Sequence, residues 1–149
     1  MKKENLKLKG SFDVKLFGPD GTLKKHLKKD NLVTDSGFDW IIQRGFSTQT
    51  GSAAANYIAI GSDGTAASTS DTALGYTLAV EQATYAHTDG EHNFSLTNTF
   101  GAGVGTGSVR EYAVQNGSPT GTIFNRATFG TIVKGSQDSL QIVFAGSLS

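Results

Sequence analysis

The sequence predicts an all-β protein, either an antiparallel β-sandwich or a jelly-roll-like barrel of about eight strands with one short helix. Two observations predict this class. Between residues 6 and 16, apolar side chains and one glycine occupy the even positions, and lysine, serine or aspartate the odd ones. This period of two is typical of a strand with one buried face. The composition, with nineteen glycines, nine phenylalanines and one methionine, also favours short strands and turns over a helical bundle.

The length of 149 residues predicts a single β domain over residues 1–149, with residues 1–9 as a basic N-terminal arm. There is no cysteine, so disulfides and thiolate metal sites are excluded. No apolar run approaches the roughly 20 residues of a membrane span, and the first ten residues lack the apolar centre of a signal peptide. We therefore expect synthesis in a cytoplasm and no membrane partner.

The N-terminal part predicts a long hairpin. The alternating strand is followed by the turn sequence Gly-Pro-Asp-Gly at residues 18–21, where proline presets φ and glycine tolerates positive φ. A second strand returns over residues 22–33. Its apolar content is low, which predicts a place at the edge of a sheet.

A short helix is predicted near residues 36–45, after Thr34 or Asp35 as the N-cap. Its predicted buried face has the spacing i, i+3, i+4, i+7. This face consists of Phe38, Ile41, Ile42 and Gly45. Trp40 is expected to be a partly buried lid or an interface residue, and it is a candidate partner-binding residue.

The next predicted strand, residues 57–60, places Tyr57 and Ala59 on one side and two isoleucines on the other. A loop of about ten small and polar residues follows, and a loop of this length is usually functional or an interface element. Asp63 and Thr65 are its candidate partner-binding residues. After it, Ser70 and Asp71 are predicted to cap a short turn. Further strands are predicted at residues 77–87, 93–100, 109–115, 122–129 and 139–148.

Positive charge is concentrated at the start of the chain. Residues 1–30 contain nine lysines and four acids, and the remainder contains four basic and nine acidic residues. One interpretation is a lysine-rich edge hairpin that prevents aggregation. The other is a basic arm that docks on an acidic neighbour. The candidate docking residues are Lys2, Lys3, Lys7 and Lys9. Nucleic acid is not an expected partner, because interleaved arginine and aromatic residues are missing.

No pattern predicts catalysis, a metal or a cofactor. The glycine-rich segment 101–107 resembles a phosphate-binding loop, but a strand-like segment follows it where a helix is required. Asp63 and Asp71 share a loop without the spacing of a calcium-binding EF-hand. The three histidines have no zinc-site spacing, and no serine lies in a nucleophile elbow.

Glu111 is the acid that most needs an explanation, because it lies in the apolar stretch 109–114. An inward-facing carboxylate requires a partner, and Arg126 is the predicted one. Structural pairing is preferred to catalysis for this residue.

Several segments together resemble small structural proteins of tailed bacteriophages. They cover most of residues 29–135, although each is short. The segments are KDNLVT at 29–34, YIAIG at 57–61, DTAL at 71–74, REYAV at 110–114, GTIFNRATF at 121–129 and IVK at 132–134, with Gly37 and Glu81 between them. The resemblance includes capsid decoration (cement) proteins and tail or fibre accessories, and it brings no catalytic residues.

The resemblance implies a non-enzymatic virion protein. Because the chain is compact and has no heptads or internal repeats, we expect a decoration protein on the capsid surface. Its expected partners are the major capsid protein and copies of itself, as a homotrimer. The alternative is a tail, baseplate or fibre module that binds a host receptor or another tail protein. A third interpretation is a carbohydrate-binding sandwich or hydrolase, for which Trp40, Tyr76, Tyr85 and Tyr112 are the candidate groove residues.

Overall fold

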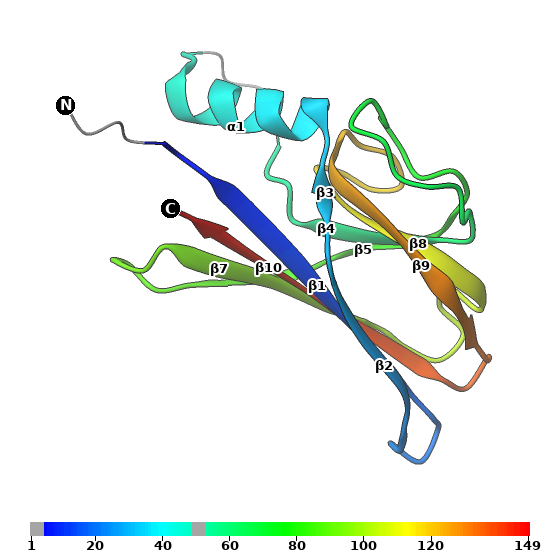
Figure 1. Ribbon diagram of the computed structural model, residues 1–149. Helices are drawn as coiled ribbons and strands as arrows, with labels where there is room; N and C mark the ends of the chain where they lie inside the picture. Colours follow the sequence, from blue (N-terminus) through cyan, green and yellow to red (C-terminus); the bar gives the residue numbers. More distant parts are fainter. Residues whose placement is uncertain (1–4, 49–52) are drawn as a thin grey trace.

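The computed structural model describes residues 5–48 and 53–149. Its strands form two antiparallel five-stranded sheets packed face to face, so the predicted all-β sandwich is confirmed (Figure 1). Sheet A has the order β2 (Leu23–Asp30), β1 (Leu8–Phe17), β10 (Ser139–Leu148), β7 (Asn93–Phe100), β6 (Thr84–His87). Sheet B has the order β3 (Leu32–Val33), β9 (Ile123–Lys134), β8 (Gly107–Gln115), β4 (Tyr57–Gly61), β5 (Thr77–Gln82). Within the described ranges, no helix has the length and apolarity needed to cross a bilayer.

The described residues form ten strands, two more than predicted, because two predicted strands are each divided between the sheets. The segment predicted as one strand over 77–87 leaves sheet B after Gln82 and enters sheet A at Thr84. The amide of Ala83 at this crossing donates a hydrogen bond to the carbonyl of Asn56 at 2.8 Å. The segment predicted over 22–33 divides in the same way at Asn31. As predicted, β2 lies at the edge of its sheet.

The core lies between the sheets and follows the alternation of the strands. In β1 the buried residues are Phe12, Val14 and Leu16, and β10 contributes Leu140, Ile142 and Phe144. Across the sandwich, the Phe12 ring contacts the Tyr112 ring of β8 with 4.4 Å between centroids. Burial raises the pKa of the Tyr112 phenol well above its usual value. Ile58 and Ile60 share one side of β4, as predicted, and this side faces the core, whereas Ala59 faces the outer side of sheet B.

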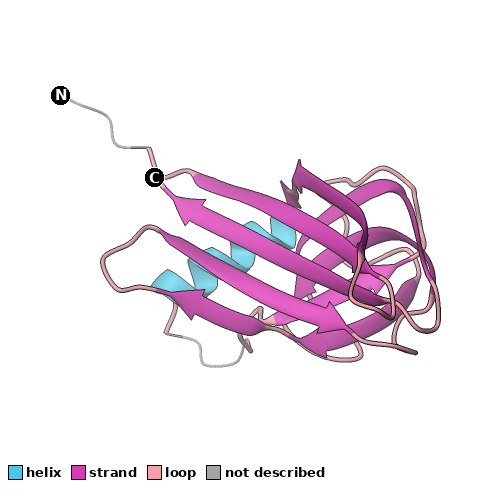
Figure 2. Ribbon diagram, turned by 90° about the horizontal axis from the view of Figure 1, so that it is seen from below, coloured by secondary structure: helices cyan, strands magenta, loops and turns pink. Residues whose placement is uncertain are grey.

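The single helix of the described residues, α1 (Asp35–Phe46), covers one end of the sandwich (Figure 2). The hydroxyl of Thr34 caps it by accepting a hydrogen bond from the Gly37 amide at 3.1 Å. Gly37 packs directly on the backbone of Phe124, and a Cβ at this position would collide with the Phe124 carbonyl. The helix therefore presents Gly37, Trp40 and Ile41 to the core.

The predicted buried face of this helix was right for Ile41 and wrong for Phe38, Ile42 and Gly45. Phe38 and Ile42 are 49% and 57% exposed, and Phe46 at the helix end is 83% exposed. Trp40 is partly buried and packs edge to face on Phe124, with 6.2 Å between ring centroids. The close approach at Gly37 explains the rotation, because it fixes which side of the helix contacts sheet B.

The two ends of the described chain lie together (Figure 1). Lys7 and Ser149 exchange backbone hydrogen bonds of 2.7 and 2.9 Å, and Leu8 and Lys9 pair with Leu148 and Ser147. The part of the predicted arm from Lys7 to Lys9 is thus joined to sheet A through β10.

Candidate functional site

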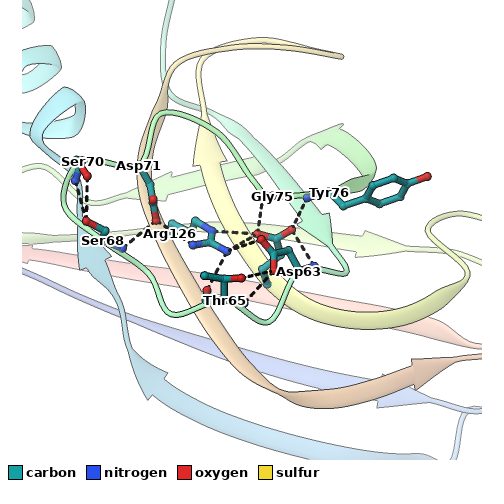
Figure 3. A network of polar contacts seen from close by, with 9 residues as sticks. Asp63, Thr65, Ser68, Ser70, Asp71, Gly75, Tyr76 and Arg126 are labelled. Carbon is teal, nitrogen blue, oxygen red and sulfur yellow. Dashed lines mark hydrogen bonds and ion pairs between the residues drawn. The ribbon is translucent and has the colours of Figure 1, made fainter.

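The long loop over residues 62–76 folds back across the outer face of sheet B (Figure 3). Leu74 is its apolar anchor and packs on three buried residues of that face. These residues are Ala59, Ala113 and Ile123. The loop also contacts the first residue of α1, because the amide of Asp35 donates a hydrogen bond to the Thr69 carbonyl at 2.8 Å. The loop therefore has fixed contacts at both the sheet and the helix.

Under this loop lies a buried ion pair between Glu111 of β8 and Arg126 of β9. Glu111 is fully buried and Arg126 is 3% exposed. The Nε and Nη2 atoms of Arg126 both lie 2.9 Å from Oε2 of Glu111. The predicted pairing of these two residues is therefore confirmed.

Glu111 also holds the two ends of the loop through backbone amides. Its Oε1 accepts hydrogen bonds from Asp63 at 3.1 Å and Tyr76 at 2.9 Å, and its Oε2 accepts one from Gly75 at 3.0 Å (Figure 3). Gly75 has no room for a side chain, because a Cβ would collide with the Asp63 carboxylate. A buried carboxylate with this many donors is fully satisfied.

Arg126 reaches the middle of the loop with its other donors. Its Nη1 donates to Oδ2 of Asp71 at 2.9 Å, and its Nη2 donates to the carbonyl of Thr65 at 3.1 Å. A longer ion-pair distance of 3.7 Å separates Nη2 from Oδ2 of Asp63. The guanidinium thus lies among three carboxylates, where it supplies the positive charge that they require.

The carboxylates of the loop are held in their ionised form. The pKa of Asp71 is lowered by the hydrogen bond from the Ser68 amide and by Arg126, against the opposing effect of partial burial. The pKa of Asp63 is lowered mainly by hydrogen bonds from the amide and hydroxyl of Thr65. Burial opposes the charge of Arg126, but hydrogen bonds to Asp71 and Glu111 outweigh it, and its pKa is raised.

In this arrangement Arg126 and the carboxylates of Glu111, Asp63 and Asp71 bind groups of the protein and hold the loop in place. Within residues 5–48 and 53–149, no three histidine or acidic side chains are grouped so that they could hold a metal ion. The predicted capping role of Asp71 was wrong, since its carboxylate pairs with Arg126 and accepts from Ser68 in a non-helical loop. Strand β8 follows the glycine-rich segment 101–107, which connects the two sheets.

The predicted partner-binding residues lie in separate places. Lys2 and Lys3 are outside the described residues, and Lys7 and Lys9 are exposed beside the chain terminus. Asp63 and Thr65 bind each other within the loop, with 2.8 Å between carboxylate and hydroxyl. Trp40 belongs to the helix and faces the core. Of the predicted residues that the structure describes, Asp63 and Thr65 are in contact, Lys7 and Lys9 lie near each other beside the C-terminus, and Trp40 lies apart from both pairs.

The basic surface is formed mainly by β2 at the edge of sheet A. Four lysines of this strand are exposed, namely Lys24, Lys25, Lys28 and Lys29. The first two have local partners, since Lys24 pairs with Asp138 at 3.0 Å and Lys25 donates to the Thr131 carbonyl at 3.0 Å. Lys28 and Lys29 have no ion-pair partner in the part of the chain that the structure describes. These two lysines are therefore free to meet an acidic surface.

A second surface was missed from the sequence, namely the exposed apolar stripe of α1, formed by Phe38, Ile42 and Phe46. These three side chains follow the spacing i, i+4, i+8 of one helix face. The spacing was visible, but Phe38 and Ile42 were assigned to the core. The four aromatic residues considered for a carbohydrate groove do not form one surface: Tyr112 is fully buried, Tyr76 lies at the end of the loop over sheet B, and Tyr85 belongs to β6 of sheet A.

Comparisons with known proteins identify no relative: no family model, curated protein or solved structure matches this chain.

Proposed function

We propose that this protein is a non-enzymatic virion structural protein, a decoration protein that binds and stabilises the head shell of a tailed bacteriophage. The resemblance of its segments to small phage structural proteins is the starting point. The observation that carries the proposal is the separation of charge, with exposed lysines on β2 and an excess of acids elsewhere. The expected partners are the major capsid protein and further copies of this chain in a trimer.

The geometry supports a binding role in two further ways. The long loop over sheet B is held by a buried ion pair whose two members both bind groups of the loop, so it offers a fixed shape. The exposed apolar stripe of α1 supplies the kind of surface that proteins bury against one another. A decoration protein needs rigid surfaces of this type, because it stabilises a shell by adding buried contact area between neighbouring subunits.

The test is reconstitution on expanded heads that were purified without this protein. Adding the protein is expected to give saturable binding and to raise the temperature at which the heads disrupt. Binding is expected to weaken as the salt concentration is raised from 50 to 500 mM, because salt screens the attraction between exposed charges. Heads that neither bind the protein nor gain heat resistance would refute the proposal.

A charge-matched pair of variants tests the basic strand. Lys28→Gln with Lys29→Gln removes two positive charges from β2, and Arg44→Gln with Arg110→Gln removes two from exposed positions on α1 and β8. We expect the lysine variant to bind heads about tenfold more weakly and the arginine variant to bind nearly as the unmodified protein does. Equal losses would show that net charge, and not β2, governs binding.

Intact virions distinguish a decoration protein from the alternative, a tail, baseplate or fibre module. Antibody labelling of intact particles is expected over the icosahedral head. A signal confined to the tail tip or baseplate would replace the decoration role by that of a tail, baseplate or fibre module.

A further inference from the structure

An apolar cavity of about 430 Å³ lies between the two sheets at the end covered by α1. Its walls come from both sheets, from the helix and from residues 54–56. Five aromatic side chains surround it, namely Trp40, Tyr85, Phe94, Phe124 and Phe144. The buried side chains of Leu96 and Val114 contribute further apolar surface, as do Ala54 and Ala55.

The aromatic walls support one another. Trp40 and Phe144 each pack edge to face on Phe124 at 6.2 Å, and Phe94 packs on Phe144 at 5.7 Å between ring centroids. The indole nitrogen of Trp40 donates to the carbonyl of Ala53 at 3.1 Å, which fixes the orientation of its ring. These contacts hold the cavity open and limit the movement by which its walls could collapse onto one another.

The lining decides the chemistry of a ligand. Among residues 5–48 and 53–149, no lysine, arginine, histidine, aspartate or glutamate lines the cavity. An ion placed there would lose its hydration without gaining a partner. Apolar cavities of about 150 Å³ bind benzene, and small-molecule sites in proteins span about 300–1,000 Å³. The volume therefore suits a molecule larger than a single benzene ring.

We propose that this cavity is a binding site for an uncharged, apolar small molecule with one or two aromatic rings. Ring faces and edges in the walls offer stacked and edge-to-face contacts to such a ligand. Tyr85, 61% exposed on the edge strand β6, marks the side from which a ligand enters. This inference does not depend on the proposed role in the virion.

The test uses the uncharged fluorescent probe N-phenyl-1-naphthylamine and the full chain. Trp40 is the sole tryptophan and lines the cavity, so a bound probe is expected to quench its emission by energy transfer. Quenching is expected to saturate at one probe per chain. Absence of saturable quenching, or several probes per chain, would overturn the proposal.

Two kinds of variant locate the bound probe. Val114→Phe and Ala55→Leu each add volume to the lining, and we expect each to weaken probe binding about tenfold or more. Ile42→Ser with Phe46→Ser removes apolar surface from the stripe of α1 and should leave the affinity within about twofold. Thermal unfolding shows whether Val114→Phe and Ala55→Leu retain the fold. The two substitutions are at separate positions, so one variant can fold even if the other does not. If the stripe variant abolishes binding while a folded filling variant does not, the probe binds the helix surface and the proposal is wrong.

Discussion

Arg126 and Glu111 are two charges that the fold has removed from water beneath a loop. Each such burial costs several kcal/mol, and only good geometry and further hydrogen bonds offset the cost. Here both conditions are met. The guanidinium and the carboxylate contact each other at 2.9 Å, the carboxylate accepts hydrogen bonds from amides of the loop, and the guanidinium binds a carbonyl and an aspartate of the loop. The pair therefore fixes the conformation of the loop. Either residue alone would be an uncompensated buried charge and would destabilise the folded state.

Breaking this pair should be strongly destabilising. Arg126→Met or Glu111→Gln is expected to lower the free energy of unfolding by about 3–5 kcal/mol, because each leaves a buried group without its partner. Urea denaturation measures the change. Asp63→Asn is the matched control, since its carboxylate is 3.7 Å from the guanidinium and partly exposed, and its effect on the free energy of unfolding should be much smaller. Equal costs for Glu111→Gln and Asp63→Asn would contradict this account.

Asp71 should make stability depend on pH in the acid range. Its pKa is lower in the folded protein than in the unfolded chain, so the folded state favours the ionised carboxylate. This contribution is complete above the ordinary carboxyl pKa of about 3.9 and is lost as the pH falls through the lower folded value. We expect Asp71→Asn to flatten the dependence of melting temperature on pH between about pH 5 and pH 2.

The Arg126→Met background provides the control for Asp71. Without the guanidinium, Asp71→Asn should flatten the acid dependence by a smaller amount, because one of the interactions that lower the Asp71 pKa is already gone. If the flattening is the same in both backgrounds, Arg126 does not act on Asp71.

At the scale of elements, helix α1 shows what the sequence could and could not predict. Its bounds were predicted to within one residue, because Thr34 offers a local capping signal. Its buried face could not be predicted in the same way, because both sides of the helix carry large apolar residues. Phe38 and Ile42 lie on one side, and Trp40 and Ile41 lie on the other. The deciding contact is that of Gly37 with the backbone of Phe124, 87 positions away in sequence. Local periodicity carries no information about such a contact.

The orientation of this helix can be tested by two substitutions. Trp40→Ala removes a ring that packs on Phe124 and should lower the free energy of unfolding by about 2–4 kcal/mol. Ile42→Ser lies on the exposed side and should change it by no more than about 0.5 kcal/mol. Chemical denaturation gives both values. A larger loss for Ile42→Ser than for Trp40→Ala would restore the face predicted from the sequence.

The loop over sheet B likewise has one feature that the sequence predicted and one that it did not. Glu111 within an apolar strand indicated a buried carboxylate, and Arg126 was the natural partner in the neighbouring strand. The place of Asp71 could not be derived, because its hydrogen bond to Arg126 joins residues 55 positions apart. Ser70 and Asp71 have the local chemistry of a helix cap, but the charge of Arg126 provides a stronger partner.

At the scale of the whole molecule, alternation predicted the strands but not their order. The register of β1 with β10 pairs Leu8 with Leu148, and no local pattern indicates that the first and last strands are neighbours. Likewise, the division of residues 77–87 at Ala83 follows from how the two sheets meet and not from the composition of the segment. Fold class thus follows from pattern, whereas topology follows from packing.

The pairing of the chain ends leads to a prediction about truncation. Deleting residues 1–6 keeps the hydrogen bonds between Lys7 and Ser149, whereas deleting residues 1–9 removes them together with the pairs of Leu8 and Lys9. We expect the longer deletion to lower the melting temperature by about 2–4 °C more than the shorter one. Differential scanning calorimetry measures the difference. Identical melting temperatures would mean that residues 7–9 add no stability to sheet A.

Lys7→Gln with Lys9→Gln separates charge from pairing in the same region. These substitutions keep the backbone pairs of β1 and remove two positive charges. The melting temperature should stay close to that of the unmodified protein, and a weaker association with heads would then be due to charge. A fall as large as that of the longer deletion would contradict the pairing explanation.

The meeting of Lys7 and Ser149 in one sheet also has a practical consequence. A passenger domain joined just before Lys7 or just after Ser149 would leave the described part of the molecule at the same place. A short peptide could likewise join the ends, with the chain reopened at the exposed turn between β1 and β2. Such a circular permutant would present its new ends beside the lysines of β2, at the opposite end of β1 from the natural ones.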